Sequence, residues 1–197
     1  SRYGVIPNSY TFDHCGPLAW TVEDCAIVLA AISGYDPNDP ASAQREVPDF
    51  RAGLTGDLRG VRIGLPTNWW EEEPAAHPAT MAAFERGIEV LKALGARVDT
   101  IRLRSRQAYN DVRSVISRSE LLSIYDADLR ARPHCFSADF IGRNLAATLF
   151  TATDIVHAQR ERRRMLAEMQ AVYERFDVLL TPAGTPAPRL DALLGGG

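Results

Sequence analysis

The chain has 197 residues, 46% of them hydrophobic and 24% charged, with a formal net charge of −3. This length and composition are those of an ordinary globular protein with one sizeable core. The slightly acidic balance favours neither nucleic acid nor an anionic membrane as a partner. The longest apolar run, residues 25–32, is far shorter than the roughly 20 residues that cross a bilayer.

The first half of the chain predicts a helix, a loop and a strand–helix–strand unit. Thr21 and Asp24 have capping-box spacing, and Gly34 is a typical stop, so a helix is expected over 21–34. Residues 35–50 contain three prolines and are expected to form a surface loop. Strands over 61–65 and 96–103 flank a helical pattern over 77–94 that Gly95 ends. This unit predicts an α/β fold with parallel strands.

The second half predicts three helices and one more strand. Helical patterns cover about 107–131, 138–147 and 152–175, and the last carries an apolar stripe of Ala158, Met165, Met169 and Val172. Residues 176–182 are predicted to form a third strand, and the tail from 185 onward is predicted to be coil.

Three short stretches invite a chemical interpretation. Asp13, His14 and Cys15 are consecutive, and neighbours in an extended segment point to opposite faces, so a linear acid–base–nucleophile relay is disfavoured. A turn role for Asp13 and a packing role for Cys15 are expected instead. Residues 160–165, RERRRM, could bind phosphate, but on a helix they favour a solvated face. Residues 69–74, WWEEEP, are either a binding patch or a loop with partly buried indoles.

The cysteines and histidines do not predict a disulfide framework or a metal site. Cys15, Cys25 and Cys135 are odd in number and lack CxxC spacing, which predicts a reducing, cytoplasmic setting. The possible metal ligands show no spacing typical of zinc, so no metal is expected; they are Asp13, His14, His77, His134, Cys135 and His157.

Four linked motifs at the start of the chain resemble the amidase signature family. They are SRYGVIP at 1–7, the set Ser9, Asp13, Gly16 and Pro17, TVED at 21–24, and the set Gly34, Asp36, Pro37 and Asp39. Later stretches continue the resemblance, at 58–66, 91–98, Glu120, 142–164 and 176–188. The resemblance implies a mixed, largely parallel sheet flanked by helices, with 1–197 a single domain lacking its N-terminal and C-terminal portions.

The resemblance implies an amidase that forms a serine acyl-enzyme with a Ser–cis-Ser–Lys triad and no cofactor. The family places this triad upstream of the stretch that matches Ser1. No Ser-Ser pair occurs in the chain, and its one lysine, Lys92, is predicted to lie on the surface. We therefore expect no catalytic residue in this chain and no activity from it alone.

The resemblance also suggests residues that bind substrate. Asp13, beside the Gly-Pro turn, is the first candidate, and Tyr125, Arg143 and Asp154 follow because the matching late helices line the family's substrate funnel. A Tyr-Asp pair typical of the glutaminase subunit of the tRNA-dependent amidotransferase is missing from 151–159, so a small free amide is expected rather than glutamine. The alternatives are a non-catalytic binding module and that glutaminase subunit. Exposed strand edges and apolar surface make a homodimer possible.

Overall fold

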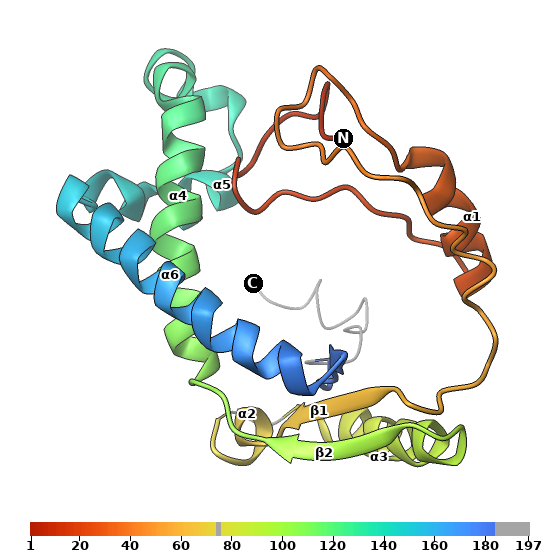
Figure 1. Cartoon of the computed structure of the whole chain (residues 1–197). Coiled ribbons are helices and arrows are strands. Elements are labelled where there is room, and N and C mark those ends of the chain that lie inside the picture. Colours follow the sequence, from red (N-terminus) through yellow and green to blue (C-terminus); the bar gives the residue numbers. More distant parts are fainter. Residues whose placement is uncertain (74–75, 184–197) are drawn as a thin grey trace. The chain divides into compact units, whose positions relative to one another are not determined.

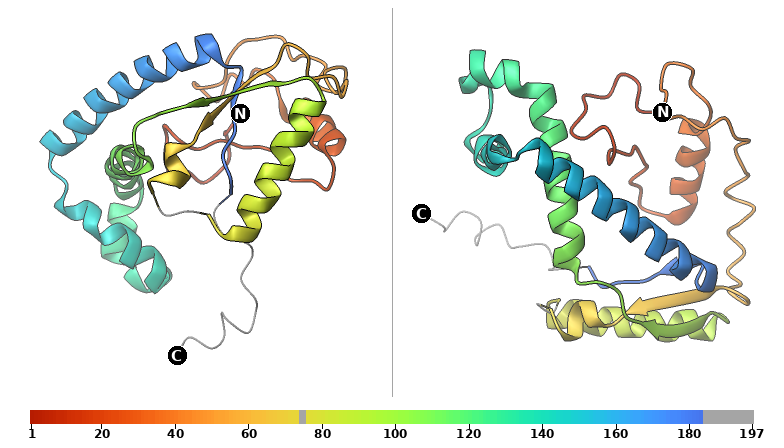
Figure 2. Two further views of the ribbon diagram at one scale, coloured as in Figure 1. Left: turned by 90° about the horizontal axis from the view of Figure 1, so that it is seen from below. Right: turned by 60° about the vertical axis from the view of Figure 1, so that its left-hand side comes forward.

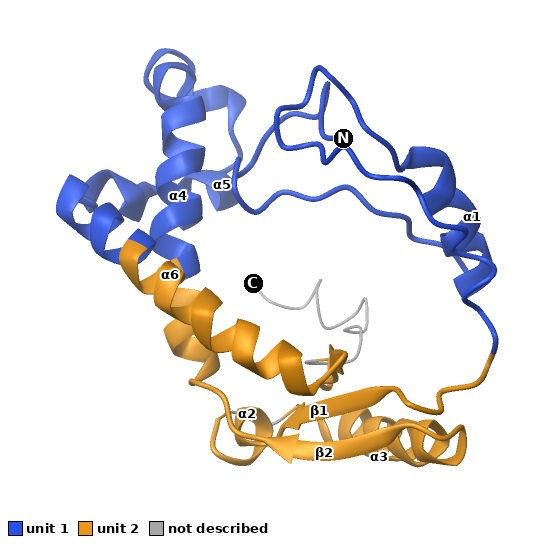
Figure 3. Cartoon of the chain, in the orientation of Figure 1, with its two compact units in different colours: residues 1–55, 113–159 blue, residues 56–112, 160–197 orange. Residues whose placement is uncertain are grey.

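The computed structural model describes residues 1–73 and 76–183 (Figure 1). The chain divides into two compact units (Figure 3). Unit 1 comprises Ser1–Thr55 and Arg113–Gln159, and unit 2 comprises Gly56–Val112 and Arg160–Gly197. Each is built from two stretches that are distant in the sequence.

Unit 2 contains a three-stranded parallel sheet. Strand β1 (Arg62–Pro66) lies between β2 (Arg97–Ile101) and β3 (Val178–Leu179), in the order β2-β1-β3. All but the first residue of β1 are buried, as expected of a central parallel strand. The predicted α/β fold with parallel strands is confirmed.

Helix α3 (Pro78–Ala93) precedes β2 and covers the core of unit 2, and the short helix α2 (Asn68–Glu71) follows β1. Figure 2 shows α3 running alongside both strands. Its half-buried side chains Phe84, Ile88 and Leu91 pack against the buried Ile63 and Leu65 of β1. After the helix, Gly95 has φ of +100°, the left-handed conformation expected of a stop.

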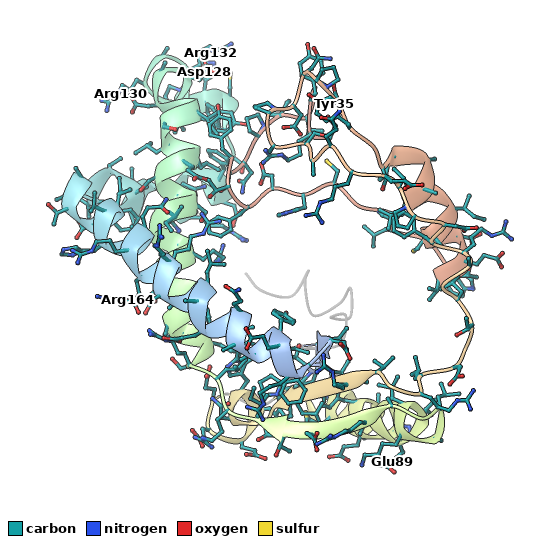
Figure 4. The ribbon with its side chains drawn as sticks, viewed as in Figure 1. Tyr35, Glu89, Asp128, Arg130, Arg132 and Arg164 are labelled. Carbon is teal, nitrogen blue, oxygen red and sulfur yellow. The ribbon has the colours of Figure 1, made fainter. Side chains whose placement is uncertain are left out.

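Helix α6 (Ala152–Arg175) has the predicted bounds and is held to the sheet by ion pairs within unit 2. Arg104, which follows β2, pairs with Glu161 at 2.5 Å and with Glu168 at 2.5 Å. At the end of the helix Arg62 binds Asp177 at 2.8 Å and holds the pKa of that carboxyl at about 2. Arg164 is exposed (Figure 4), which agrees with a solvated basic face.

Unit 1 contains α1 (Val22–Ile32), α5 (Ala138–Asn144) and most of α4 (Arg106–Ala131), a helix that begins in unit 2. Thr21 caps α1 by accepting a hydrogen bond from the Asp24 amide at 3.1 Å, as the spacing predicted. Two 3₁₀ turns, Pro133–Cys135 and Leu145–Leu149, flank α5. None of the helices in the described ranges combines the length and the apolar character needed to cross a bilayer.

Three predicted elements are longer than the observed ones, and the first is the strand expected over 96–103, which spans Arg97–Ile101. The helix expected over 138–147 ends at Asn144 and continues as a 3₁₀ turn. The third strand, expected over 176–182, is two residues long, Val178–Leu179, although the amides of Asp177 and Leu180 on either side of it also donate to carbonyls of β1, those of Arg62 and Gly64. The predicted coil from 185 onward lies outside the described residues.

Gly64 lets β3 approach the centre of the sheet, and its replacement is expected to destabilise the fold. A Cβ there would lie 2.7 Å from Leu179 Cδ2 and 3.1 Å from Phe176 Cγ. We expect Gly64→Ala to lower the free energy of unfolding by about 1–3 kcal/mol, measured by chemical denaturation. Gly87→Ala, on open surface of α3, is the matched control and should raise stability by up to about 1 kcal/mol. Equal stability of the two variants would contradict this packing.

Candidate functional site

Two adjoining hollows in unit 1 form a groove along the N-terminal segment. Their volumes are about 530 and 700 Å³. The residues that line both are Arg2, Tyr10, Asp13, His14, Cys15 and Asp39. We call this pair of hollows the N-terminal groove.

The loop after α1 holds the beginning of the chain against the groove. Asp36 accepts a hydrogen bond from Ser1 Oγ at 2.7 Å. Asp39, 7% exposed, accepts from the Arg2 amide at 2.7 Å and from the Ala41 amide at 2.9 Å. The amide hydrogen bonds favour the charged form, so the pKa of Asp39 lies below its usual range. Asp36 and Asp39, the two carboxylates of the Gly-x-Asp-Pro-x-Asp motif, therefore both hold the beginning of the chain in place.

Asp13 closes a turn beside the groove. Its Oδ2 accepts from the amides of Asn8 at 2.7 Å and Ser9 at 2.9 Å, which confirms the predicted turn role. The next residue, His14, contacts the Phe12 carbonyl through Nδ1 at 2.7 Å. The predicted packing role of Cys15 is wrong: its side chain is exposed because the segment runs along the groove wall.

Glu120 of α4 binds the same segment, although the sequence identified it only as a motif position. Its carboxylate accepts from the hydroxyl of Ser9, from Thr11 Oγ1 at 2.8 Å and from the Thr11 amide at 3.2 Å. Ser9 is 1% exposed, so this carboxylate is the acceptor for a buried hydroxyl. In the sequence, the motif match marked the position of Glu120, but it did not point to the partner Ser9, which lies 111 residues earlier.

Tyr125 also contacts the N-terminal segment. Its hydroxyl donates to the Pro7 carbonyl at 3.1 Å. Its ring packs edge-on against Phe136 and Phe140, with centroids 6.0 and 5.8 Å apart. Asp13 and Tyr125 therefore both bind this segment: Asp13 accepts from the amides of Asn8 and Ser9, and Tyr125 donates to the Pro7 carbonyl.

The other two predicted site residues make local contacts. Arg143 binds Asp139, one turn earlier on α5, at 2.8 Å, and both side chains are well exposed. Asp154 accepts from Thr151 Oγ1 at 2.7 Å and from its amide at 2.8 Å, which lowers the pKa of Asp154. Thr151 in turn accepts from the Asp154 amide at 3.2 Å, so the two residues form a capping box at the start of α6.

Three further predictions concern Lys92, the WWEEEP stretch and a metal site. Lys92 lies on α3 and pairs with Glu89 (Figure 4) at 2.9 Å, with both side chains substantially exposed. Trp69 donates to the Arg104 carbonyl at 2.7 Å and is half-buried, which favours a structural role over a binding patch, although Asn68–Glu71 form helix α2 rather than the expected loop. Within 1–73 and 76–183, no three His, Cys, Asp or Glu side chains gather closely enough to hold a metal ion.

A parallel sheet flanked by helices makes this chain an α/β protein. The family profile described as Amidase matches residues 1–195, and the chain belongs to the amidase signature family.

Individual relatives agree with this assignment. The chain is 34% identical over 179 residues to a protein named amidase from Pseudomonas putida, covering 91% of this chain and 38% of that protein. It is 32% identical over 215 residues to a glutamyl-tRNA(Gln) amidotransferase subunit from Pelobacter propionicus, covering 96% and 44%. The chain thus spans less than half the length of these relatives.

Solved structures show the same fold. A protein from a vestigial complex related to the origins of an s-triazine catabolic enzyme superposes with a TM-score of 0.79 at 31% identity, covering 95% of this chain and 40% of that one. A glutamyl-tRNA(Gln) amidotransferase subunit from Thermotoga maritima gives a TM-score of 0.74 at 25% identity, covering 96% and 41%.

The bonds of Asp39 predict an acid-sensitive contribution to stability. Because its pKa is lowered by folding, this contribution is present above the unfolded value of about 3.9 and is lost as the pH falls through the lower folded value. We expect Asp39→Asn to be less stable than wild type at neutral pH and to lose less stability on acidification. Melting temperatures measured between about pH 6 and pH 2.5 check this. Parallel curves for the two proteins would contradict it.

Proposed function

We propose that the complete protein is an amide hydrolase that acts on a small carboxylic amide. The observation that carries this proposal is the match of the Amidase profile to residues 1–195, which includes every residue of the N-terminal groove. The relative named amidase, at 34% identity, supports the same reaction class.

The proposed chemistry proceeds through a serine acyl-enzyme. A serine attacks the amide carbonyl, a second serine and a neutral lysine carry the proton to the leaving amine, and water then releases the acid. Backbone N–H groups stabilise the oxyanion. Lys92 is unsuited to be this base because it is exposed and forms an ion pair with Glu89, whereas the scheme needs a neutral amine. We therefore propose that the serine pair and the lysine belong to a part of the protein outside these 197 residues.

Within this scheme the chain supplies scaffold and part of the substrate pocket. Asp13 lines the N-terminal groove, and Tyr125 fixes the segment that carries it. Arg143 forms an exposed ion pair with Asp139, so its guanidinium can reorient toward a substrate carbonyl or carboxylate at small cost. Asp154 contributes by starting α6 in the correct place.

A second candidate is the glutaminase subunit of an amidotransferase. The name of the Pelobacter propionicus relative, at 32% identity, favours it. The stretch 151–159 lacks the Tyr-Asp pair expected of such subunits, so we prefer a small free amide as substrate.

We further propose a cytoplasmic protein that can form a homodimer. All three cysteines are free, as is usual in a reducing compartment. In this chain Leu18 and Trp20 are fully exposed, at 102% and 99%, and such apolar surface favours association.

Ammonia release tests the proposed function. The complete protein should hydrolyse simple aliphatic or aryl amides faster than glutamine, whereas the 197-residue chain alone should show no turnover. Loss of an activated nucleophile or its base typically costs several orders of magnitude in rate. Turnover by the chain alone that disappears in Cys15→Ala would instead indicate a cysteine hydrolase, and turnover of glutamine alone would favour the amidotransferase subunit.

Arg143→Ala in the complete protein tests the proposed binding role. We expect KM to rise by about tenfold with a nearly unchanged melting temperature, because the pair with Asp139 is exposed. Arg130→Ala is a matched control, since Arg130 makes an equivalent exposed pair with Asp126 at 2.9 Å. A KM equal to that of the control would exclude Arg143 from substrate binding.

A further inference from the structure

We propose that Glu120 is a positioning residue for the N-terminal groove, acting through Ser9 and Thr11 rather than by touching substrate. The inference rests on the proposed function, since it assigns the groove to substrate binding. The lining residues of the two hollows include Thr11, Asp13 and Cys15 but not Glu120. Any effect of Glu120 on the groove must therefore pass through the segment that it holds.

The hydrogen bonds connect Glu120 to the groove wall in two steps. The Glu120 carboxylate accepts from the Ser9 hydroxyl, and the Ser9 amide donates to Asp13 Oδ2 at 2.9 Å. Thr11, which lies between Ser9 and Asp13, donates hydrogen bonds to Glu120 from both its hydroxyl and its amide. The turn over residues 8–13 is thus held by two carboxylates: that of Asp13, which belongs to the turn, and that of Glu120 on α4.

The burial of Ser9 makes its hydrogen bond to Glu120 important for stability. Ser9 is 1% exposed, and leaving a buried hydroxyl without an acceptor lowers the stability of the folded state. Hydrogen bonds to a carboxylate are also stronger than those between neutral groups. Loss of the Glu120 carboxylate therefore favours states in which the segment leaves α4, and these states move Asp13 and its neighbours out of the groove wall.

Tyr125 provides a second attachment from the same helix. Its hydroxyl binds the Pro7 carbonyl, so α4 holds the segment at Pro7, Ser9 and Thr11. Because this second attachment persists when Glu120 is replaced, the change should remain local and the protein should still fold.

The variants are made in the complete protein. Glu120→Gln keeps the shape of the side chain but removes its charge and one acceptor. Thr11→Val is the milder change, because it removes one hydroxyl from an exposed residue and leaves the amide bond to Glu120. Asp128→Asn is the matched control: Asp128 lies on α4 (Figure 4) and binds Arg132 at 2.6 Å in an exposed pair.

Two readouts separate positioning from general stabilisation. Hydrogen exchange of a peptide covering residues 7–13 should become about tenfold faster in Glu120→Gln, with the peptides of α3 unchanged. The KM for the amide substrate should rise by about tenfold with kcat within about twofold, and Thr11→Val should show smaller changes in the same direction. Asp128→Asn should match wild type in both.

The outcomes are distinct. Unchanged local exchange in Glu120→Gln overturns the inference whatever the activity. Faster exchange with an unchanged KM overturns the link to substrate and leaves Glu120 a stabilising residue. Exchange does not depend on catalysis, so an inactive wild type would refute the proposed function separately.

Discussion

The carboxylate of Glu120 joins two stretches of unit 1 that are more than 100 residues apart, and the N-terminal groove depends on this contact. The segment before α1, residues 1–21, forms no helix or strand, and it is held by short backbone turns together with hydrogen bonds to side chains. Asp13 closes the turn from within, Asp39 holds Arg2, and Glu120 supplies the attachment to a rigid helix. Three motif residues, Asp13, Asp39 and Glu120, thus each have a structural role in holding this segment.

The two units contribute to the proposed enzyme in different ways. Unit 2 has a small parallel sheet with a buried central strand, in which Gly64 allows the close approach of Phe176 and Leu179. Unit 1 carries the groove and all four predicted substrate residues. Acyl-enzyme chemistry needs an activated nucleophile as well as a binding surface. The chain spans less than half the length of its relatives, and in our proposal it supplies part of the substrate pocket while the serines and the lysine lie elsewhere in the protein.

Much of the fold could be predicted from the sequence because its signals are local. The cap at Thr21, the stop at Gly95 and the bounds of α6 follow from residues within one or two turns of the boundary. The length of β3 could not be predicted in this way, since it is set by pairing with β1, more than 100 residues earlier. Among the site residues, the turn role of Asp13 was predictable, whereas Cys15 was expected to pack and is exposed.

The family, the order of the strands and of the longer helices, and the helix caps could be inferred from the amino-acid sequence, because motifs and helix ends depend on neighbouring residues; the short helix α2 was expected to be a loop. The partners that these motif residues bind were decided by the tertiary structure. Folding paired Ser9 and Thr11 with Glu120, directed the Tyr125 hydroxyl to the Pro7 carbonyl, and placed Lys92 in an exposed ion pair. These outcomes depend on which distant segments meet, and a hydrogen bond between residues 111 positions apart leaves no periodic trace in the sequence.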